Sequence, residues 1–542
     1  MIEDYSIEVV AVGGIPVQSF KHRFKSIPAM FNKSANIYGE KPFLVEGERR
    51  LTVRETQDQV SLIAALLRTE YGILKGHHVG ILMENSINFI IAFLGIQQLG
   101  ATAVVFNHHL AVPELERQIK ISDLELLILS PAFSAKIENI NPDTLPEKIL
   151  RLSSEWITSL PGKERPAAFE EIDEDAVALI LFTSGTTGLP KGTMITHRNL
   201  ITSACKQGYY SYHHLRMKNR ENSKTILVAP LFHVLAIQEQ LMGAIYSGTT
   251  LYILPVFNAQ MYLDLIVRER INLLVGTPTM FWLLLHKTPI QKYDVSCIEA
   301  VKYGGAPMPP DLLAEMKAIF EDVQFVNGYG LTEASVITLL LDEFSEQRPT
   351  SVGQPALCSE VKFVDSSGKE VKVNEVGELA VKGSLVSKGY YKLNEETKRA
   401  YRNGWFFTGD MGYRDEEGFI YLVGRSKEMI NRGGEKVYPV EVENILHLHP
   451  KILDVTVFGI PDPVIGECVG CAMVLRPGIQ DLHLEEVQEF CKEKMAYYKI
   501  PQKIVVLPEL PRNPGGKVIK KKVLEQYLSM NLHEKRVLKE PD

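Results

Sequence analysis

Short apolar runs and helical patterns alternate along the chain from about Thr52. The runs are rich in Val, Ile and Leu, a composition typical of strands that are covered on both faces. Because strands that alternate with helices favour a parallel sheet with helices on its faces, the pattern predicts an α/β fold. The predicted strands are His78–Met83, Ala101–Phe106, Leu124–Leu129, Ala176–Phe182, Thr225–Ala229 and Leu273–Gly276.

After about Ser351 the apolar runs become shorter and are separated by Gly-containing turns. This change predicts a small β-barrel-like subdomain or antiparallel sheet, in which a turn at Asp415–Gly418 joins two strands. Its predicted strands are Val361–Val364, Val371–Val373, Glu378–Val381, Trp405–Phe407 and Phe419–Val423.

A further unit begins after Gly424-Arg425, with helices and strands of its own. We place the domain boundary at Lys427, which separates a large N-terminal domain of residues 1–426 from a small α+β C-terminal domain of residues 427–542. The predicted elements of the C-terminal domain are Val440–His447, Leu484–Ala496, Val455–Gly459, Gly470–Leu475 and Lys503–Leu507.

Length and charge narrow the class of protein. At 542 residues the chain exceeds what a single hydrophobic core supports, so two or more domains are expected. A net charge of −7 argues against nucleic acid as a partner. The most apolar window, Ile87–Phe106, contains Asn88, Gln97 and Gln98, which are out of place in a membrane span. We therefore predict a buried helix that runs into a strand.

The N-terminus and the cysteines favour a cytoplasmic protein. The chain opens with an acidic segment, Met1–Tyr5, where a signal peptide would be basic. Of the six cysteines, Cys468 and Cys471 alternate with apolar residues like core positions of a strand. Neither a second cysteine pair nor a nearby histidine completes a zinc site with them. We therefore predict core positions, and a redox or metal-binding role of Cys468 and Cys471 is the alternative.

The stretch Ile180–Asn199, ILFTSGTTGLPKGTMITHRN, has the chemistry of a phosphate-binding loop. Small residues let backbone N–H groups approach an anion, while hydroxyls and Lys191 add donors and charge. A helix is predicted to start near Thr196, and the Gly and Lys spacing differs from that of P-loop NTPases. The loop residues are Thr183, Ser184, Gly185, Thr186, Thr187 and Gly188.

Together with later motifs in the same order, this stretch closely resembles the adenylate-forming superfamily. That superfamily comprises acyl- and aryl-CoA synthetases, the adenylation domains of nonribosomal peptide synthetases and beetle luciferases. The resemblance extends from about Leu51 to Leu528 and is strongest to fatty- or aryl-acid CoA ligases. The loop and Lys191 are therefore expected to bind ATP.

A second motif, NGYGLTEA, follows a predicted strand at Val323–Val326. The resemblance implies that Tyr329 stacks on adenine, that Thr332 bonds the α-phosphate and that Glu333 reaches Mg²⁺, a cation that prefers oxygen ligands. The glycines around this tyrosine belong to the same nucleotide site, and an upstream loop resembles the one that lies against adenine and the acyl pocket. These residues are Gly328, Gly330, Gly304, Gly305 and Ala306.

A third motif, WFFTGDMGYRDEEGFIYLVGR, contains two further nucleotide-binding candidates. Asp410 has the two acceptor oxygens needed to hold both ribose hydroxyls, and Arg425 can donate to the ribose or to a phosphate. A solvated surface aspartate is the alternative for Asp410.

The C-terminal motifs imply a mobile domain. By resemblance, Lys427 is the hinge about which the small domain swings between two catalytic poses. Gly433 and Gly434 would lie beside the tunnel for coenzyme A, where glycines admit a thin ligand. Lys517, in the loop LPRNPGGKV, matches the catalytic lysine of the family.

The segment Pro230–Val234, PLFHV, resembles the gate of the acyl pocket, with His233 as its swinging aromatic residue. Amino-acid-activating relatives have an aspartate where this chain has Val234, so an acid without an α-amine is favoured. A core histidine is the alternative for His233, and the choice between a fatty and an aryl acid stays open.

These motifs predict an enzyme of the acid–thiol ligase class, an AMP-forming acyl-CoA synthetase of fatty acid metabolism. It would convert a small carboxylic acid to acyl-AMP with release of pyrophosphate and then to a coenzyme A thioester, using ATP, Mg²⁺ and coenzyme A. The predicted catalytic residues are Lys517, Thr332, Glu333 and Lys191. The alternatives are a stand-alone adenylation enzyme that loads a carrier protein and a catalytically silent nucleotide-binding protein. Whether the chain forms a homodimer is left open.

Overall fold

The structure is a computed structural model that describes residues 4–153, 171–183, 190–433, 435–512 and 518–537. The chain folds into two compact units. Unit 1 comprises Met1–Val361 and Val381–Phe407, and unit 2 comprises Lys362–Ala380 and Thr408–Asp542. Lys427 lies within unit 2, and the domain boundary predicted there stays a prediction.

The first large sheet of unit 1 is mostly parallel, as the apolar runs predicted. In the described part of the chain its strand order is β10-β9-β6-β5-β7-β8. Neighbouring strands from β9 to β8 are parallel, and β10 is antiparallel to β9. The strands are β5 (His78–Leu82), β6 (Thr102–Val105), β7 (Leu124–Leu129), β8 (Ile149–Arg151), β9 (Val177–Thr183) and β10 (Lys191–Thr196).

The second large sheet has the order β17-β16-β15-β14-β13-β11-β12-β3-β4 among the described residues. Its strands from β15 to β3 are parallel, and antiparallel strands close both edges. They are β3 (Pro42–Glu46), β4 (Arg49–Thr52), β11 (Lys224–Leu227), β12 (Thr250–Ile253), β13 (Leu273–Gly276), β14 (Ala300–Gly304), β15 (Gln324–Leu331), β16 (Ser335–Leu340) and β17 (Gln354–Pro355).

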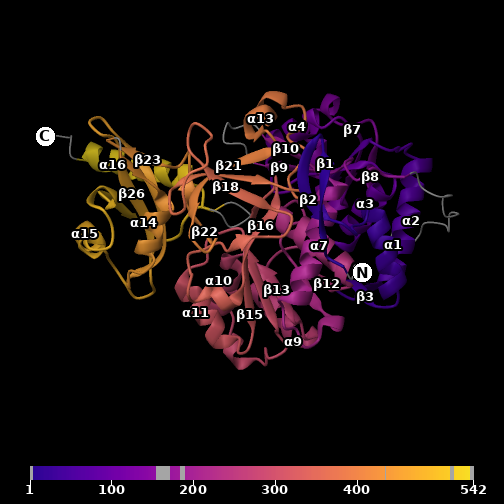
Figure 1. Cartoon of the computed structure of the whole chain (residues 1–542), viewed down its shortest axis with the longest axis horizontal. Helices are drawn as coiled ribbons and strands as arrows, with labels where there is room; N and C mark the ends of the chain where they lie inside the picture. Colours follow the sequence, from indigo (N-terminus) through magenta and orange to yellow (C-terminus); the bar gives the residue numbers. More distant parts are fainter. Residues whose placement is uncertain (1–3, 154–170, 184–189, 434, 513–517, 538–542) are drawn as a thin grey trace. The chain divides into compact units, whose positions relative to one another are not determined.

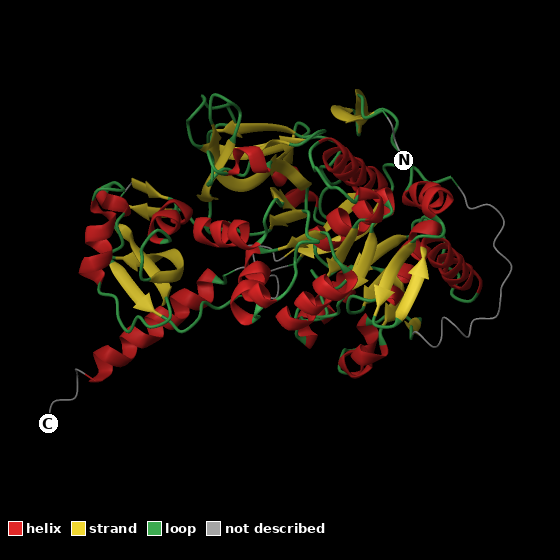
Figure 2. Ribbon diagram, turned by 90° about the horizontal axis from the view of Figure 1, so that it is seen from below, coloured by secondary structure: helices red, strands yellow, loops and turns green. Residues whose placement is uncertain are grey.

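Consecutive residues of these strands enter two different hydrophobic cores, which explains why the runs are apolar without interruption. Ile226 packs under α9 (Ala259–Glu269), α10 (Pro278–Lys287) and α11 (Pro310–Ile319), which lie beside β13 and β15 in Figure 1. The next residue, Leu227, joins a central core that also includes Val79 and Ile81 of the first sheet. Figure 2 shows helices on both sides of the strands of unit 1.

The apolar window at Ile87–Phe106 forms a buried helix followed by a strand, as predicted. Helix α3 (Ile87–Gln98) begins at its N-cap Ser86 and is buried over almost its whole length, and β6 follows it. It packs against α2 (Val53–Thr69) in the central core. In the described part of the chain, no helix combines the length and the apolar character needed to cross a membrane.

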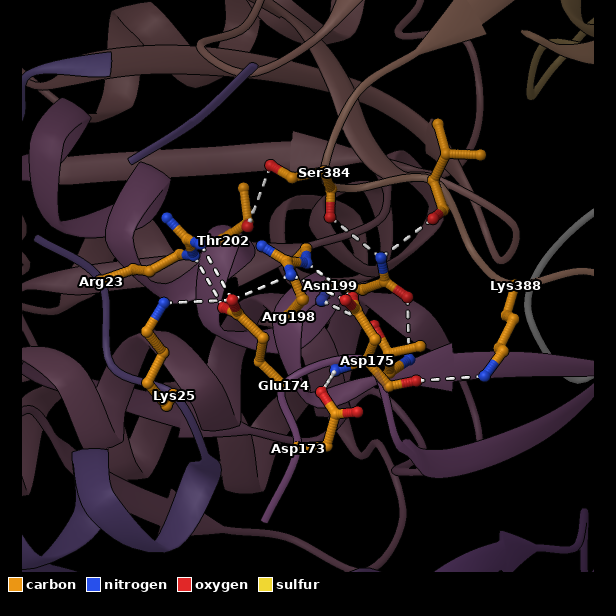
Figure 3. Close-up of polar contacts among 12 residues, drawn as sticks. Arg23, Lys25, Asp173, Glu174, Asp175, Arg198, Asn199, Thr202, Ser384 and Lys388 are labelled. Carbon is orange, nitrogen blue, oxygen red and sulfur yellow. Dashed lines mark hydrogen bonds and ion pairs between the residues drawn. The ribbon is translucent and has the colours of Figure 1, made fainter. Parts of the chain in front are cut away.

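Helix α7 (His197–His213) is anchored at its N-terminus by a buried ionic network. The Glu174 carboxylate accepts hydrogen bonds from Arg23 and Lys25 at 2.8–3.1 Å and forms an ion pair with Arg198 at 2.9 Å (Figure 3). The Arg23 and Arg198 side chains are only 3% and 5% exposed, so each depends on its carboxylate partners, which are Glu174 for both, Glu8 for Arg23 and Asp175 for Arg198. Burial opposes the ionisation of Glu174, but the three cations together hold its pKa below the ordinary value.

The same end of α7 holds the segment Ser384–Lys388. The Asn199 amide donates to the carbonyls of Ser384 and Val386 at 2.9 Å, and Thr202 bonds the Ser384 hydroxyl at 3.1 Å. Lys388 donates to the carbonyl of Asp175 at 3.3 Å (Figure 3). Segments that are far apart in the sequence are therefore fixed to one helix end.

Unit 2 contains the predicted hairpin from Thr408 onward and the C-terminal elements. The antiparallel strands β21 (Trp405–Arg414) and β22 (Ile420–Arg425) flank the turn at Asp415–Gly418. A separate sheet contains β23 (Ile430–Arg432), β24 (Glu435–Val437), β25 (Ile452–Asp462), β26 (Gly466–Leu475) and β27 (Lys503–Val506). Its helices are α14 (Pro439–Leu446), α15 (Leu484–Lys492) and α16 (Lys520–Val537).

Two details of the unit 2 prediction have a clear outcome. Cys468 and Cys471 are buried positions of β26, as predicted. The strand predicted at Val371–Val373 is wrong, because this segment has no strand pairing. Val371 donates to the carbonyl of Phe363 only where the chain returns from a turn, and the extended pairing does not continue.

We expect Glu174→Ala to lower the free energy of unfolding by about 2 kcal/mol, because two buried guanidinium groups each lose one carboxylate partner and keep the other, Glu8 for Arg23 and Asp175 for Arg198. Urea unfolding at pH 7 measures the change. The stabilisation should be present above the ordinary pKa of a glutamate and be lost as the pH falls through the lowered folded value. The control is Glu395→Ala, which breaks the exposed pair with Lys398. Equal, small effects of both changes would contradict the role of the network.

Candidate active site

The predicted site residues are distributed over both units. Most of them lie in the described part of the chain. The remainder lie outside the described residues, namely Ser184, Gly185, Thr186, Thr187, Gly188, Gly434 and Lys517.

The two residues that flank the predicted phosphate loop face each other across a hairpin. Thr183 ends β9, Lys191 begins β10, and the two are register partners. Lys191 thus lies on a strand before the predicted helix. The helix start near Thr196 is confirmed, since the Thr196 hydroxyl accepts from the Asn199 backbone N–H and α7 begins at His197.

The segment Lys388–Tyr391 runs alongside β10. Its backbone exchanges three hydrogen bonds with Gly192 and Met194, at 2.8–2.9 Å. This pairing brings the Tyr390 ring beside Lys191, whose Nζ lies 4.8 Å from the ring centroid. The ammonium group is thus held by a cation–π contact at the base of the predicted loop.

Glu333 reaches the same tyrosine from another direction. Thr332 and Glu333 occupy the turn between β15 and β16, and the Tyr390 hydroxyl donates to Glu333 Oε1 at 2.9 Å. The backbone N–H of Ser387 donates to the Glu333 carbonyl at 2.7 Å. The fold therefore brings Lys191 and Glu333 together around Tyr390, a residue that the sequence analysis missed. The signal in the sequence was the glycine before it, Gly389. The structure shows that this position has a φ of +110°, which favours glycine.

The predicted glycines permit a very close approach of backbones. Gly304 and Gly328 are register partners of β14 and β15, and a Cβ on Gly304 would lie 2.2 Å from the Gly328 carbonyl oxygen. A Cβ on Gly330 would lie 1.9 Å from the Ser335 carbonyl oxygen. The residues of the NGYGLTEA motif up to Leu331 lie within β15 and not after a strand, so Tyr329 faces Thr338 across a hairpin.

A cavity of about 670 Å³ opens beside these glycines, a volume within the usual range of ligand pockets. Five of the predicted site residues line it, namely Val234, Gly304, Gly305, Gly328 and Gly330. The described lining residues include Val234 but not its neighbour His233. The position of Val234 agrees with the predicted acyl pocket.

His233 belongs to an aromatic cluster beside the cavity. Its ring lies 4.5 Å from that of Phe232, which also contacts His108 and His109. Burial, with a smaller effect of His109, lowers the pKa of His233 to about 4. Burial also lowers the pKa of His108 to about 4. These two histidines are therefore neutral near pH 7 and offer no positive charge to a substrate.

In unit 2 the two predicted ribose-binding residues pair with each other. Asp410 and Arg425 are register partners of β21 and β22, and Arg425 Nε lies 2.8 Å from Asp410 Oδ1. Asp410 is only 6% exposed, which argues against a solvated surface aspartate. The Arg425 contact orients the carboxylate, as expected for a charge-assisted hydrogen bond.

The predicted hinge and coenzyme A residues also lie in unit 2. Lys427 is exposed in the turn Ser426–Glu428, directly after β22. Gly433 has a φ of +61° and donates its N–H to the Ile465 carbonyl at 2.7 Å. A positive φ favours glycine at this position for backbone reasons alone.

Comparison with known proteins gives consistent matches over both units. The AMP-binding enzyme family matches residues 31–391, and the AMP-binding enzyme C-terminal domain matches residues 441–517. A long-chain-fatty-acid–CoA ligase of Bacillus subtilis is 30% identical over 542 aligned residues, covering 93% of this chain and 94% of that protein.

Solved structures agree with these matches. The o-succinylbenzoate CoA synthetase of Bacillus subtilis with its acyl-adenylate intermediate is 30% identical, with a TM-score of 0.78, and covers 92% of this chain and 98% of that one. The same enzyme with ATP and magnesium ion is 29% identical, with a TM-score of 0.78, and covers 91% and 98%.

Proposed function

Because the chain belongs to the family of AMP-binding enzymes, we propose that it is an acid–thiol ligase, which converts a carboxylic acid to its coenzyme A thioester through an acyl-adenylate. The observation that supports this most directly is the arrangement of Lys191 and Glu333 around Tyr390, beside a cavity lined by Gly304 and Val234. A phosphate-binding cation, a carboxylate and an acyl-sized cavity are what adenylate formation requires.

In the first step, an oxygen of the substrate carboxylate attacks the α-phosphorus of ATP. The bond from this phosphorus to the bridging oxygen of the β-phosphate breaks, and pyrophosphate leaves. Two anions that approach to about 4 Å repel each other by roughly 4 kcal/mol at an effective dielectric constant near 20. The positive charges of Lys191 and Lys517 offset this repulsion, and fixed positions of the reactants supply most of the remaining rate enhancement.

The residues also fit the magnesium ion that the family implies. Among the described residues, no cluster of three or more His, Cys, Asp or Glu is present. A single carboxylate such as Glu333 suits Mg²⁺, which is commonly bound through one or two carboxylates plus waters and substrate phosphates. When bound, Mg²⁺ neutralises phosphate charge. Thr332 would donate to the α-phosphate, Tyr329 would stack on adenine, and Asp410 with Arg425 would bind the ribose.

In the second step, the coenzyme A sulfur attacks the carbonyl carbon of the adenylate. The bond from this carbon to the phosphate oxygen breaks, AMP leaves, and the thiol proton passes to solvent. We place the hinge of the accompanying domain rotation at Lys427 and the pantetheine tunnel at Gly433 and Gly434. The rotation would remove Lys517 from the site and thus separate the two half-reactions.

The substrate is a fatty or aryl acid without an α-amine. Val234 lines the cavity where an ammonium-binding aspartate would be needed for an amino acid. A cytoplasmic location fits the cysteines, all six of which are free and buried. A carrier protein in place of coenzyme A is the second acceptor that the experiment must distinguish.

Pyrophosphate release from ATP, measured over a panel of fatty, aryl and amino acids with and without coenzyme A, tests this proposal. We expect turnover with a fatty or aryl acid that rises strongly when coenzyme A is added. Slow or stoichiometric release of pyrophosphate that does not depend on coenzyme A would favour a carrier-protein acceptor. No release with any acid would contradict the proposed function.

Replacement of the proposed catalytic lysine separates the two steps. Lys517→Ala should reduce pyrophosphate release by at least 100-fold, because a positive charge is lost where charge develops in the transition state. Thioester formation from supplied acyl-adenylate should remain near the wild-type rate. Full activity of the variant with ATP would exclude this role for Lys517.

Tyr390 is proposed as a positioning residue for Glu333. Tyr390→Phe removes the hydrogen bond to the carboxylate and keeps the ring that contacts Lys191. We expect the Mg²⁺ concentration for half-maximal activity to rise about 10-fold, as for other groups that orient a metal ligand. The control is Tyr391→Phe, which removes a hydroxyl that donates to Asp123 at 2.8 Å. An unchanged Mg²⁺ dependence of Tyr390→Phe would contradict the assignment.

A further inference from the structure

A group of polar and charged side chains, two of them buried and two half-buried, lies at the wall of the 670 Å³ cavity, where a pocket for a plain fatty acid would be apolar. The group extends from Lys206 and Gln207 of α7 to Glu239 of the π-helix η4 (Leu235–Leu241) and Lys302 of β14. Gln207, Glu239 and Lys302 line the cavity itself. The mechanism proposed above uses none of these side chains.

Glu239 is saturated by its neighbours. Its Oε1 accepts hydrogen bonds from Lys206 at 2.9 Å and from the hydroxyls of Ser203 and Ser335. The Lys206 and Glu239 side chains are 0% and 5% exposed. Burial opposes the ionisation of Glu239, but Lys206 and the hydrogen-bond donors hold its pKa below the ordinary value. The two residues therefore form a neutralised ion pair.

Lys302 is linked to this pair through an uncharged group. The Gln207 amide donates to Glu239 Oε2, which orients the Gln207 carbonyl oxygen toward Lys302. Lys302 Nζ donates to this oxygen at 2.8 Å, and the Ser211 hydroxyl is 3.5 Å away, beyond a normal hydrogen bond. Because an ammonium group has three N–H donors, donor capacity remains on the cavity side.

The charges of this group do not balance. With Lys206 and Glu239 neutralising each other, the Lys302 ammonium leaves one positive charge at the cavity wall. Burial lowers the pKa of Lys302 to about 8, with Glu239 acting against this shift and Lys206 adding to it. The Lys302 ammonium is therefore still mostly protonated near pH 7. A partly desolvated ammonium group of this kind is costly unless a ligand or water pairs with it.

We propose that Lys302 binds a second, anionic carboxylate at the far end of the substrate, so that the preferred acid is a dicarboxylate. This inference rests on the proposed function, and it names the substrate class of the same cavity. Lys302 lies two residues before Gly304, roughly 6–7 Å along the strand. That separation from the nucleotide end suits a distal group of the acid and not the carboxylate that reacts.

Two other cations are held differently at the cavity wall, although Arg220 Nε has no hydrogen-bond partner among the described residues. Lys41 and Arg220 also line the cavity, but each donates to a backbone carbonyl, of Glu221 and Leu215 respectively. Lys302 instead donates to an amide oxygen that the Lys206–Glu239 pair orients. A carboxylate would provide Lys302 with a charged partner in a site where such a hydrogen bond is strong.

The experiment compares kcat/KM for dicarboxylic acids of graded length, including aromatic ones, with monocarboxylic and ω-hydroxy acids of matched length. Pyrophosphate release with coenzyme A present is the readout. We expect wild-type protein to prefer one dicarboxylic acid over its monocarboxylic counterpart by about 100-fold or more. Lys302→Met should remove this preference and leave kcat/KM for the monocarboxylic acid within about threefold.

Lys317→Met is the matched control, since its ammonium pairs with Asp342 outside the cavity and the preference should persist. Turnover of the monocarboxylic acid shows that each variant is folded. Should Lys302→Met not fold, Gln207→Met removes the acceptor that orients Lys302, and it should weaken the preference by about 10-fold.

Equal use of mono- and dicarboxylic acids by the wild-type protein would overturn the inference and leave the proposed function intact. A preference for the ω-hydroxy acid over the dicarboxylate would overturn the assignment of a charged group. Failure of every acid to release pyrophosphate would instead contradict the proposed function itself.

Discussion

The pairing of Lys388–Tyr391 with β10 is the contact on which the described part of the site in unit 1 depends. It holds a segment from late in the chain against the strand that begins with Lys191. The same segment reaches the Glu333 turn through Ser387 and Tyr390. Without these backbone hydrogen bonds, the distance between the Lys191 ammonium and the Glu333 carboxylate would not be fixed. Preorganised charges are effective in catalysis because they need no rearrangement during the reaction.

The segment that pairs with β10 is also held by hydrogen bonds to the N-terminal part of α7. Asn199 holds the carbonyls of Ser384 and Val386, and the neighbouring Arg198 shares Glu174 with Arg23. Buried arginines bind carboxylates with defined geometry, so the network specifies one position for the helix end. The position of the candidate site in unit 1 therefore depends on a buried ionic network outside that site.

The cavity combines close backbone packing on one side with polar and charged side chains on another. Its glycine edge exists because β14 approaches β15 at Gly304, and β15 approaches β16 at Gly330, too closely for any side chain. Its polar wall places Lys302 next to a neutralised pair and not next to a carboxylate. A chain that activated only simple fatty acids would gain nothing from this desolvated charge. The family match establishes the reaction class, whereas the choice of acid follows from such individual side chains.

Much of this protein followed from the sequence, because local signals carried the relevant physics. Uninterrupted Val, Ile and Leu runs indicated strands buried on both faces, and the central strands confirm this prediction. The Thr196 helix start was predictable because capping depends on neighbouring residues. The strand predicted at Val371–Val373 was wrong because a strand needs a pairing partner, and a local pattern cannot show whether the fold provides one. The ordered motifs identified the family, which the matches over residues 31–391 and 441–517 confirm.

Tertiary structure alone decided which distant residues meet. Tyr390 lies 57 positions from Glu333 in the sequence, and no periodicity connects the two. Lys206, Glu239 and Lys302 come from a helix, a π-helix and a strand, and each resembles an ordinary residue of its own element. The sequence by itself determined the elements and the reaction class, since both depend on short-range patterns. The charge inside the cavity was decided by the fold, because electrostatic energy depends on distances in space and not along the chain.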